Sequence, residues 1–258
     1  FLPKIEDIEN EIQELKTAGD KENLAQKEEL LTLIDTLNES NPMLGHRGCR
    51  LGITFPSIYD MQVRAILRAS ALLIKQGKTV RPEIMIPLAG HVNELSFIKE
   101  RVRSIAESIE EEFGTSVPFK FGTMIEVPRA AETADEMAEE AEFFSFGSND
   151  LTQMTFAFSR DDAERKFLQH YQKKEILPAN PFATLDRAVG KIMARATRDG
   201  RQTNPNLSVG ICGEHGGDPQ SVEMCHNMSI DYVSASPFRV PVARLAAAQA
   251  TLKSERKK

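Results

Sequence analysis

The sequence contains 258 residues, of which 41% are hydrophobic and 27% are charged, and it has no tryptophan. This composition is typical of a soluble globular protein, and the length matches one (β/α)8 barrel. The net charge of −6 argues against the broad basic surface of a nucleic-acid-binding protein. No apolar run approaches the roughly 20 residues that a membrane-spanning helix requires, so we expect no membrane partner.

Residues 5–38 are predicted to form a helical hairpin. Ile5, Ile8 and Ile12 recur at helical spacing, a second apolar series begins at Leu24, and the two series are joined at Ala18-Gly-Asp20. We expect a helical cap packed on a larger body, because a partner-binding coiled coil needs longer heptad series. The sequence therefore predicts two domains, the hairpin at 1–42 and a main domain at 43–258.

From residue 43 onward, short apolar strands alternate with amphipathic helices. The helix after the first strand is expected to begin with a capping box at Ser57. Its apolar stripe is Ile58, Met61, Ala65, Ala69 and Leu72. Six strands are predicted, at residues 43–48, 83–88, 119–127, 143–148, 208–212 and 232–236.

Apolar strands that alternate with helices predict an α/β fold with an all-parallel sheet covered by helices. A closed (β/α)8 TIM barrel has eight strand–helix units, and only about six are visible here. The sequence therefore predicts either an open six-stranded sheet or an incomplete TIM barrel. The helical hairpin does not supply the two missing units.

Two of the predicted strands end close to a carboxylate, Glu126 in the first case and Asp150 in the second. A crossover helix between them would make the strands parallel and place both carboxylates at the carboxyl end of the sheet. Mg²⁺ binds to one or two carboxylates together with water and substrate oxygens. We therefore favour Glu126 and Asp150 as metal ligands, with structural salt bridges to arginines as the alternative.

Small and basic residues surround these carboxylates in the predicted strand ends. Gly147, Ser148 and Asn149 directly precede Asp150 and offer small side chains and backbone N–H groups to an anion. Arg47 lies between Gly45 and Gly48, and its guanidinium can bind the oxygens of a carboxylate or phosphate. These residues predict a site for a small anionic substrate.

Cys212 ends a predicted strand and is followed by a glycine-rich turn with Glu214 and His215, which are candidates to tune a proton transfer. A thiol with an ordinary pKa of about 8.5 can act as a general acid near neutral pH. The alternative is that Cys212 is a small buried hydrophobic residue without a chemical role. Cys49 and Cys225 lack such surroundings, and the wide spacing of the three cysteines argues against disulfides and zinc. It favours a reducing compartment, the cytoplasm or, in some eukaryotes, an organelle.

Several long motifs resemble the pyruvate, phosphate dikinase branch of the phosphoenolpyruvate (PEP)-utilising enzymes. They include Leu44-Gly-His-Arg-Gly-Cys-Arg-Leu51, Gly122-Thr-Met-Ile-Glu-Val-Pro-Arg129, Phe143-Phe-Ser-Phe-Gly-Ser-Asn-Asp-Leu-Thr-Gln153 and Gly210-Ile-Cys-Gly-Glu-His-Gly-Gly-Asp-Pro219. The resemblance covers residues 40–250. It implies a (β/α)8 barrel that binds PEP or pyruvate, with two more strands upstream that each end in a substrate-binding arginine.

The resemblance also implies roles for individual residues. Glu126 and Asp150 become Mg²⁺ ligands, and Arg47 binds the phosphoryl or enolate oxygens of the substrate. Gly147, Ser148 and Asn149 line the substrate pocket, and Cys212 donates a proton to the C3 carbon. The resemblance further implies that the phosphoryl donor is a phosphohistidine on another domain. This sequence contains neither that domain nor the ATP-binding domain of the family. The resemblance also implies a homodimer.

We therefore expect the domain in which a phosphohistidine phosphorylates pyruvate enolate to give PEP. The complete family reaction interconverts ATP, phosphate and pyruvate with AMP, diphosphate and PEP. The alternatives are the related domain of a PEP synthase or of the phosphotransferase-system enzyme I. A non-catalytic dimerisation fragment is a further alternative of a different class.

Overall fold

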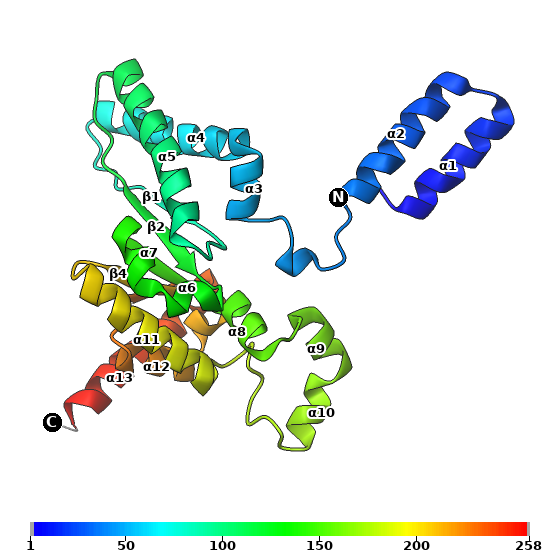
Figure 1. Ribbon diagram of the computed structural model, residues 1–258. Helices are drawn as coiled ribbons and strands as arrows, with labels where there is room; N and C mark the ends of the chain where they lie inside the picture. The colour runs from blue at the N-terminus through cyan, green and yellow to red at the C-terminus, as the bar shows by residue number, and fades with distance from the viewer. Residues whose placement is uncertain (1–2, 257–258) are drawn as a thin grey trace. The chain divides into compact units, whose positions relative to one another are not determined.

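The structure, a computed structural model, describes residues 3–256 and divides into two compact units, Phe1–His46 and Arg47–Lys258. In the first unit, α1 (Ile5–Ala18) and α2 (Lys21–Leu37) form the predicted hairpin (Figure 1). Gly19 ends α1 with a φ of 74°, a left-handed conformation that favours glycine. The hairpin has its own small core, built from Ile8, Ile12 and Ile34.

The second unit is built around a parallel sheet with the strand order β1-β2-β3-β4-β5. The strands are β1 (Glu83–Ile86), β2 (Lys120–Ile125), β3 (Phe143–Gly147), β4 (Ser208–Cys212) and β5 (Tyr232–Val233). This confirms the predicted α/β class and the parallel sheet. Within residues 3–256, β1 and β5 each pair with a single neighbour, so the barrel is not closed.

The predicted strand at 43–48 is wrong, and the sheet has five strands instead of six. A 3-10 turn, η1 (Pro42–Leu44), occupies its start, and helix α3 (Cys49–Thr54) begins directly after it. Proline cannot donate a ladder hydrogen bond, and Gly48 has a φ of 59°, which lies outside the strand region. The Cys49 N–H instead donates to the Pro87 carbonyl at 3.0 Å, which holds the start of α3 beside the end of β1.

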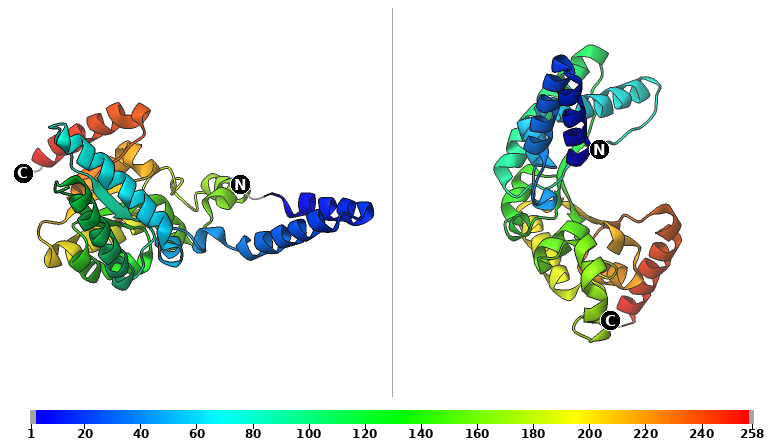
Figure 2. Two further views of the ribbon diagram at one scale, coloured as in Figure 1. Left: turned by 90° about the horizontal axis from the view of Figure 1, so that it is seen from above. Right: turned by 90° about the vertical axis from the view of Figure 1, so that its right-hand side faces the viewer.

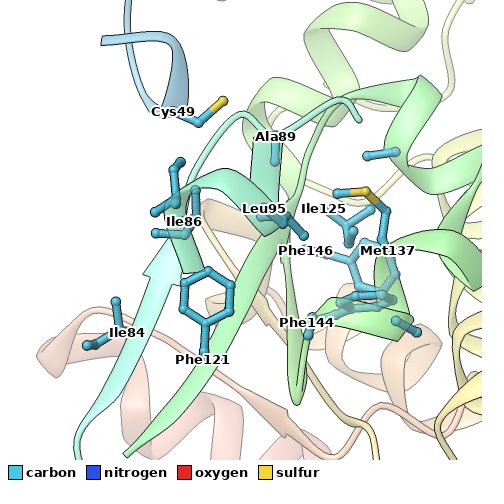
Figure 3. Packing of buried hydrophobic residues seen from close by; sticks show 14 of the residues in the cluster. Cys49, Ile84, Ile86, Ala89, Leu95, Phe121, Ile125, Met137, Phe144 and Phe146 are labelled. Carbon is cyan, nitrogen blue, oxygen red and sulfur yellow. The ribbon is translucent and has the colours of Figure 1, made fainter. Parts of the chain in front are cut away.

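One face of the sheet is apolar and packs against helices. The parallel register pairs Ile84 with Phe121 and Phe146 with Ile211, and side chains alternate between the two faces of each strand. Figure 3 shows Ile84, Phe121, Phe144 and Phe146 gathered with Leu95 of α5 and Met137 of α7. By the same alternation, the opposite face carries Glu83, Met85, Lys120, Gly122, Met124, Phe143, Ser145, Gly147, Ser208, Gly210, Cys212 and Tyr232. The candidate site residues Gly147 and Cys212 therefore belong to the more polar face.

Six of the seven covering helices pack in pairs, with α4 beside α5, α7 beside α11, and α12 beside α13, and α6 also lies beside α11 (Figures 1 and 2). They are α4 (Pro56–Lys75), α5 (Val92–Phe113), α6 (Pro128–Glu132), α7 (Ala134–Glu140), α11 (Arg187–Thr203), α12 (Pro219–Asn227) and α13 (Val240–Glu255). Two 3-10 turns, η2 (Glu214–Gly217) and η3 (Pro237–Arg239), precede α12 and α13. No helix among residues 3–256 is long and apolar enough to cross a membrane.

Helix α4 buries a different face from the one predicted. It begins at Pro56 without a side-chain cap, so the capping box at Ser57 is wrong. Val63, Leu67 and Ala71 are buried, whereas Met61 is 61% exposed. Both faces of α4 carry apolar residues, so the spacing of apolar residues in the sequence does not show which face is buried. Packing against α5 determines it.

A small lobe follows helix α8 (Ser148–Phe156) and contains α9 (Arg160–Lys166) and α10 (Leu168–Lys173). Its core consists of Ala163, Leu168 and Phe182, which form a cluster separate from the main core. The rings of Phe158 and Phe167 meet edge to face at 5.0 Å between centroids. We call residues 158–182 the 158–182 lobe.

Candidate active site

The sheet register brings three candidate residues to one level at its carboxyl end. Gly147, the last residue of β3, pairs with Cys212, the last residue of β4. On the other side of β3, Ile125 pairs with Phe146, so Glu126 stands level with Gly147 one residue beyond the end of β2. Parallel neighbours that end together present their last side chains at a common edge, where barrel enzymes hold their active sites.

Glu126 is a buried carboxylate with only 4% of its surface exposed. Its Oε1 accepts a hydrogen bond of 2.8 Å from the Leu88 N–H, and no ion pair of the described residues includes it. Burial is the main reason that the pKa of Glu126 is raised to about 7. The hydrogen bond from Leu88 lowers this pKa. The negative charge of Asp150 raises it, and the positive charge of Arg47 lowers it. A buried carboxylate in this state favours a bound cation when it ionises.

Leu88 holds Glu126 through an unusual backbone conformation. Its φ is 59°, and a bulky residue in the left-handed region is an outlier that the surrounding structure must enforce. Gly48 packs against it, since a Cβ at Gly48 would lie 2.9 Å from Leu88 Cβ. The loop that carries Arg47 and the backbone that binds Glu126 are thus locked together. The sequence contains no local signal for this contact.

Arg47 and Asp150 form an ion pair beside Glu126. Arg47 Nη2 lies 2.5 Å from Asp150 Oδ1, and Gln153 Nε2 donates to the same oxygen at 3.4 Å. Asp150 lies in the first turn of α8 and not at the end of the strand, because β3 ends at Gly147. The structure therefore brings both predicted carboxylates and the predicted arginine together.

Ser148 and Asn149 hold the loop that follows Cys212. Ser148 Oγ donates to the Cys212 carbonyl at 2.8 Å, and Asn149 Oδ1 accepts from the Glu214 N–H at 3.4 Å. Gly213 has a φ of 103°, and a Cβ there would lie 2.9 Å from Ser148 Oγ. Glycine is therefore required at this position, on both conformational and steric grounds.

The Cys212 thiol is half-buried and donates to the Phe146 carbonyl at 3.6 Å. Burial raises its pKa, a hydrogen bond from Ser145 lowers it, and the charge of Glu126 raises it. The thiol is therefore protonated at neutral pH, as a proton donor requires. The described contacts of His215, which the sequence suggested as a neighbour that tunes this thiol, go to Ser148 and Pro181 instead.

The oxygen donors at this edge fit Mg²⁺. Residues 3–256 contain no group of three or more His, Cys, Asp and Glu side chains that could hold a metal ion. Mg²⁺ needs only one or two carboxylates, because it retains water and takes oxygens from the substrate. Glu126 and Asp150 supply that number, and a cation would offset the burial of Glu126.

Comparison with known proteins shows the family of the chain. The family model described as "PEP-utilising enzyme, PEP-binding domain" matches residues 8–252. The chain belongs to the PEP-utilising enzymes. The motifs around Glu126, Asp150 and Cys212 all fall inside the matched range of this PEP-binding domain.

Three relatives among the PEP-utilising enzymes are named pyruvate, phosphate dikinase. The protein from Entamoeba histolytica is 54% identical over 99% of this chain, and that from Clostridium symbiosum is 57% identical over 88%. The chloroplastic protein 1 from Arabidopsis thaliana is 54% identical over 96% of the chain. The chain spans 29%, 26% and 25% of these relatives, or about a quarter of their length.

Proposed function

We propose that this chain is the PEP- and pyruvate-binding part of a pyruvate, phosphate dikinase and works together with a phosphohistidine domain. The observation that carries the proposal is the meeting of Arg47, Glu126, Asp150 and Cys212 at the carboxyl end of the sheet. A buried acid, a guanidinium and a protonated thiol suit a small anion that gains or loses a proton at carbon. The names of the three relatives support this reading over a PEP synthase.

In the direction of pyruvate formation, the O–P bond of PEP breaks and the phosphoryl group moves to an imidazole nitrogen of the partner domain's histidine. The enolate of pyruvate remains. The Cys212 Sγ–H then donates its proton to C3, which forms the C–H bond of the methyl group and leaves a thiolate that regains a proton from water. General acid catalysis of this kind contributes typically ~10²–10⁴-fold to a rate.

The other residues would bind and orient the substrate. The Arg47 guanidinium would contact the phosphoryl or enolate oxygens and offset their charge. Gly147, Ser148 and Asn149 would line the site at the start of α8. Glu126 and Asp150 would hold Mg²⁺, which when bound supplies Lewis-acid stabilisation of the negative charge on the enolate oxygen.

Exchange of deuterium from solvent into the methyl group of pyruvate, in the presence of Mg²⁺, tests this function. We expect the protein to catalyse the exchange and Cys212→Ala to lower its rate by about 10²–10⁴-fold, because the proton donor at C3 is removed. Cys225→Ala is the matched control, since Cys225 is a buried cysteine in α12. The exchange is followed by NMR or mass spectrometry of pyruvate. Equal rates for Cys212→Ala and Cys225→Ala would contradict the proposed role of the thiol.

A second candidate function, self-association, is favoured by an exposed apolar surface on η3 and α13. Phe238 is 95% exposed and Leu245 is 61% exposed, and Val240, Val242 and Leu252 are also exposed. Surfaces of this kind on soluble proteins mark interaction sites. We propose that two copies of the chain pair through this surface, in agreement with the homodimers that the sequence resemblance implies.

Leu245→Glu is expected to weaken this dimer, because pairing would bury a charge on each copy. A cost of about 1.4 kcal/mol raises the dissociation constant about tenfold, and two buried charges cost more than that. Sedimentation velocity over a range of concentrations measures the effect. Met61→Glu, at an equally exposed position on α4, is the control. If Met61→Glu dissociates the dimer and Leu245→Glu does not, the pairing surface lies elsewhere.

A further inference from the structure

His215 is the one histidine of the described residues that is completely buried, with 0% of its surface exposed. It lies in η2, immediately after the loop that follows Cys212. Both ring nitrogens have partners, and the partners come from two other segments of the chain. Nδ1 lies 2.8 Å from Ser148 Oγ, and Nε2 lies 2.9 Å from the Pro181 carbonyl.

The two contacts join the candidate site to the 158–182 lobe. Ser148 begins α8 and precedes the site residues Asn149 and Asp150. Pro181 lies at the other end of that lobe, beside the core residue Phe182. A second connection runs in parallel, because the Arg160 N–H donates to Gln153 Oε1 at 2.9 Å and Gln153 Nε2 donates to Asp150 Oδ1 at 3.4 Å.

Counting hydrogens shows that these contacts depend on the state of the imidazole. Three contacts are involved, and each needs one hydrogen. They join the Pro181 carbonyl to His215 Nε2, His215 Nδ1 to Ser148 Oγ, and Ser148 Oγ to the Cys212 carbonyl. A neutral imidazole and a serine hydroxyl supply two, so one contact places two acceptors face to face. An imidazolium supplies the third hydrogen and satisfies all three contacts.

Opposing charges surround the ring. Burial lowers the pKa of His215. The hydrogen bond with the Pro181 carbonyl and the negative charges of Asp218 and Glu214 raise this pKa, whereas the positive charge of Arg160 lowers it. Burial is the largest of these effects. The ring therefore gains its second proton only below the ordinary range of histidine, and the contacts tighten as the pH falls.

We propose that His215 is a positioning residue that fixes Ser148 at the start of α8 through Nδ1 and holds the 158–182 lobe to the site through Nε2. Its contribution to catalysis rests on the proposed function, because it acts through the residues that would bind the substrate. The contact with the lobe needs no substrate and stands on its own. The two nitrogens serve different segments, so their effects are separable.

Two amide substitutions separate them. Asparagine places an amide atom where Nδ1 lies, and glutamine places one where Nε2 lies. In the protein at its full encoded length, we expect His215→Gln to raise the KM for pyruvate in the exchange assay by about threefold to tenfold with little change in kcat, the effect of one lost hydrogen bond. His215→Asn should keep KM within about twofold by retaining the contact with Ser148.

The lobe is expected to respond in the opposite order. Lys166, Lys173 and Lys174 are exposed, so limited trypsin digestion reports on opening of the lobe. His215→Asn loses the contact with Pro181 and should be cleaved there about threefold to tenfold faster than wild type, whereas His215→Gln should be cleaved at the wild-type rate. The ratio of the His215→Gln KM to the wild-type KM should also increase as the pH falls below 6.5, the ordinary pKa of histidine, because glutamine cannot gain the proton.

His226→Asn is the matched control. His226 lies in α12, and its Nε2 is 3.3 Å from the Oγ of Ser254 in α13, so this contact involves neither Ser148 nor the 158–182 lobe. It should change neither KM nor the cleavage of the lobe. The proposal is overturned if His215→Asn and His215→Gln change both measurements to the same extent, or if His215→Asn leaves cleavage unchanged. If the wild type catalyses no exchange, the proposed function fails, and the cleavage rates of the two variants alone decide whether His215 holds the lobe.

Discussion

Replacement of Glu126 by glutamine is expected to stabilise the metal-free protein at pH 8 and to abolish the stabilisation that Mg²⁺ gives the wild type. Glutamine keeps the shape of the side chain and an oxygen that accepts the Leu88 N–H, which lies 2.8 Å from Oε1. It removes the negative charge that burial makes costly. The same change removes a proposed Mg²⁺ ligand, so a gain in stability and a loss of metal binding should occur together.

The direction of this effect follows from the pKa of Glu126, which burial raises from 4.5 to about 7 in the folded protein. Between these values the folded state binds more protons than the unfolded state, so stability falls as the pH rises from 4.5 to 7. Above pH 7 the loss is complete and amounts to about 3 kcal/mol as an upper value. At pH 8 this is the stability that glutamine restores, and at pH 4 the substitution should have little effect.

Thermal unfolding at pH 4 to 8, with and without Mg²⁺, measures both parts of the prediction. For the wild type at pH 8, a Mg²⁺ concentration of 100 times the Kd would add about 2.7 kcal/mol. Glu107→Gln, on an exposed face of α5, is the control and should keep the wild-type response to Mg²⁺. A Glu126→Gln protein that is still stabilised by Mg²⁺ to the wild-type extent would exclude Glu126 as a ligand.

The sequence predicted the parts of the site that depend on strand ends. The apolar runs before Glu126 and before Asp150 became β2 and β3, and parallel pairing then left their carboxyl ends side by side. Asp150 reached the same edge from the first turn of α8, because the chain turns into a helix immediately after Gly147. The proximity of Glu126 and Asp150 therefore follows from the alternation of strands and helices, which can be read from a single sequence.

The contacts that fix these residues could not be predicted in the same way. Leu88 binds Glu126 from a left-handed conformation, and Pro181 binds a histidine 34 residues further along the chain. Neither contact has a local pattern, since each depends on how a loop docks against the folded sheet. The residues at 43–48 show the converse case, because a strand was predicted there, whereas the chain forms a 3-10 turn at Pro42–Leu44 and Gly48 has a left-handed φ of 59°.

Gly147→Ala is expected to destabilise the protein and to remove its response to Mg²⁺, although alanine suits the backbone there. Gly147 has a φ of −77°, so the constraint is steric. A Cβ at this position would overlap Glu126 Oε2 and would lie 2.6 Å from Met124 Sδ and 2.8 Å from Glu126 Cβ. Overpacking of this kind typically costs about 1–3 kcal/mol, and the methyl group would displace the carboxylate from the proposed metal site.

A double-mutant cycle assigns this effect to the contact with Glu126. Gly147→Ala should cost less in a Glu126→Ala background, by about 0.5–3 kcal/mol of coupling, because the overlapping oxygen is gone. Gly200→Ala is the overpacking control, since a Cβ there would lie 2.7 Å from Phe144 Cε2 and 2.9 Å from Leu207 Cδ2, within the helix-covered core. We expect it to lower the thermal stability while the response to Mg²⁺ is kept. Additive costs for Gly147→Ala and Glu126→Ala would mean that Gly147 does not position the carboxylate, and the small residue before Ser148 would then need another explanation.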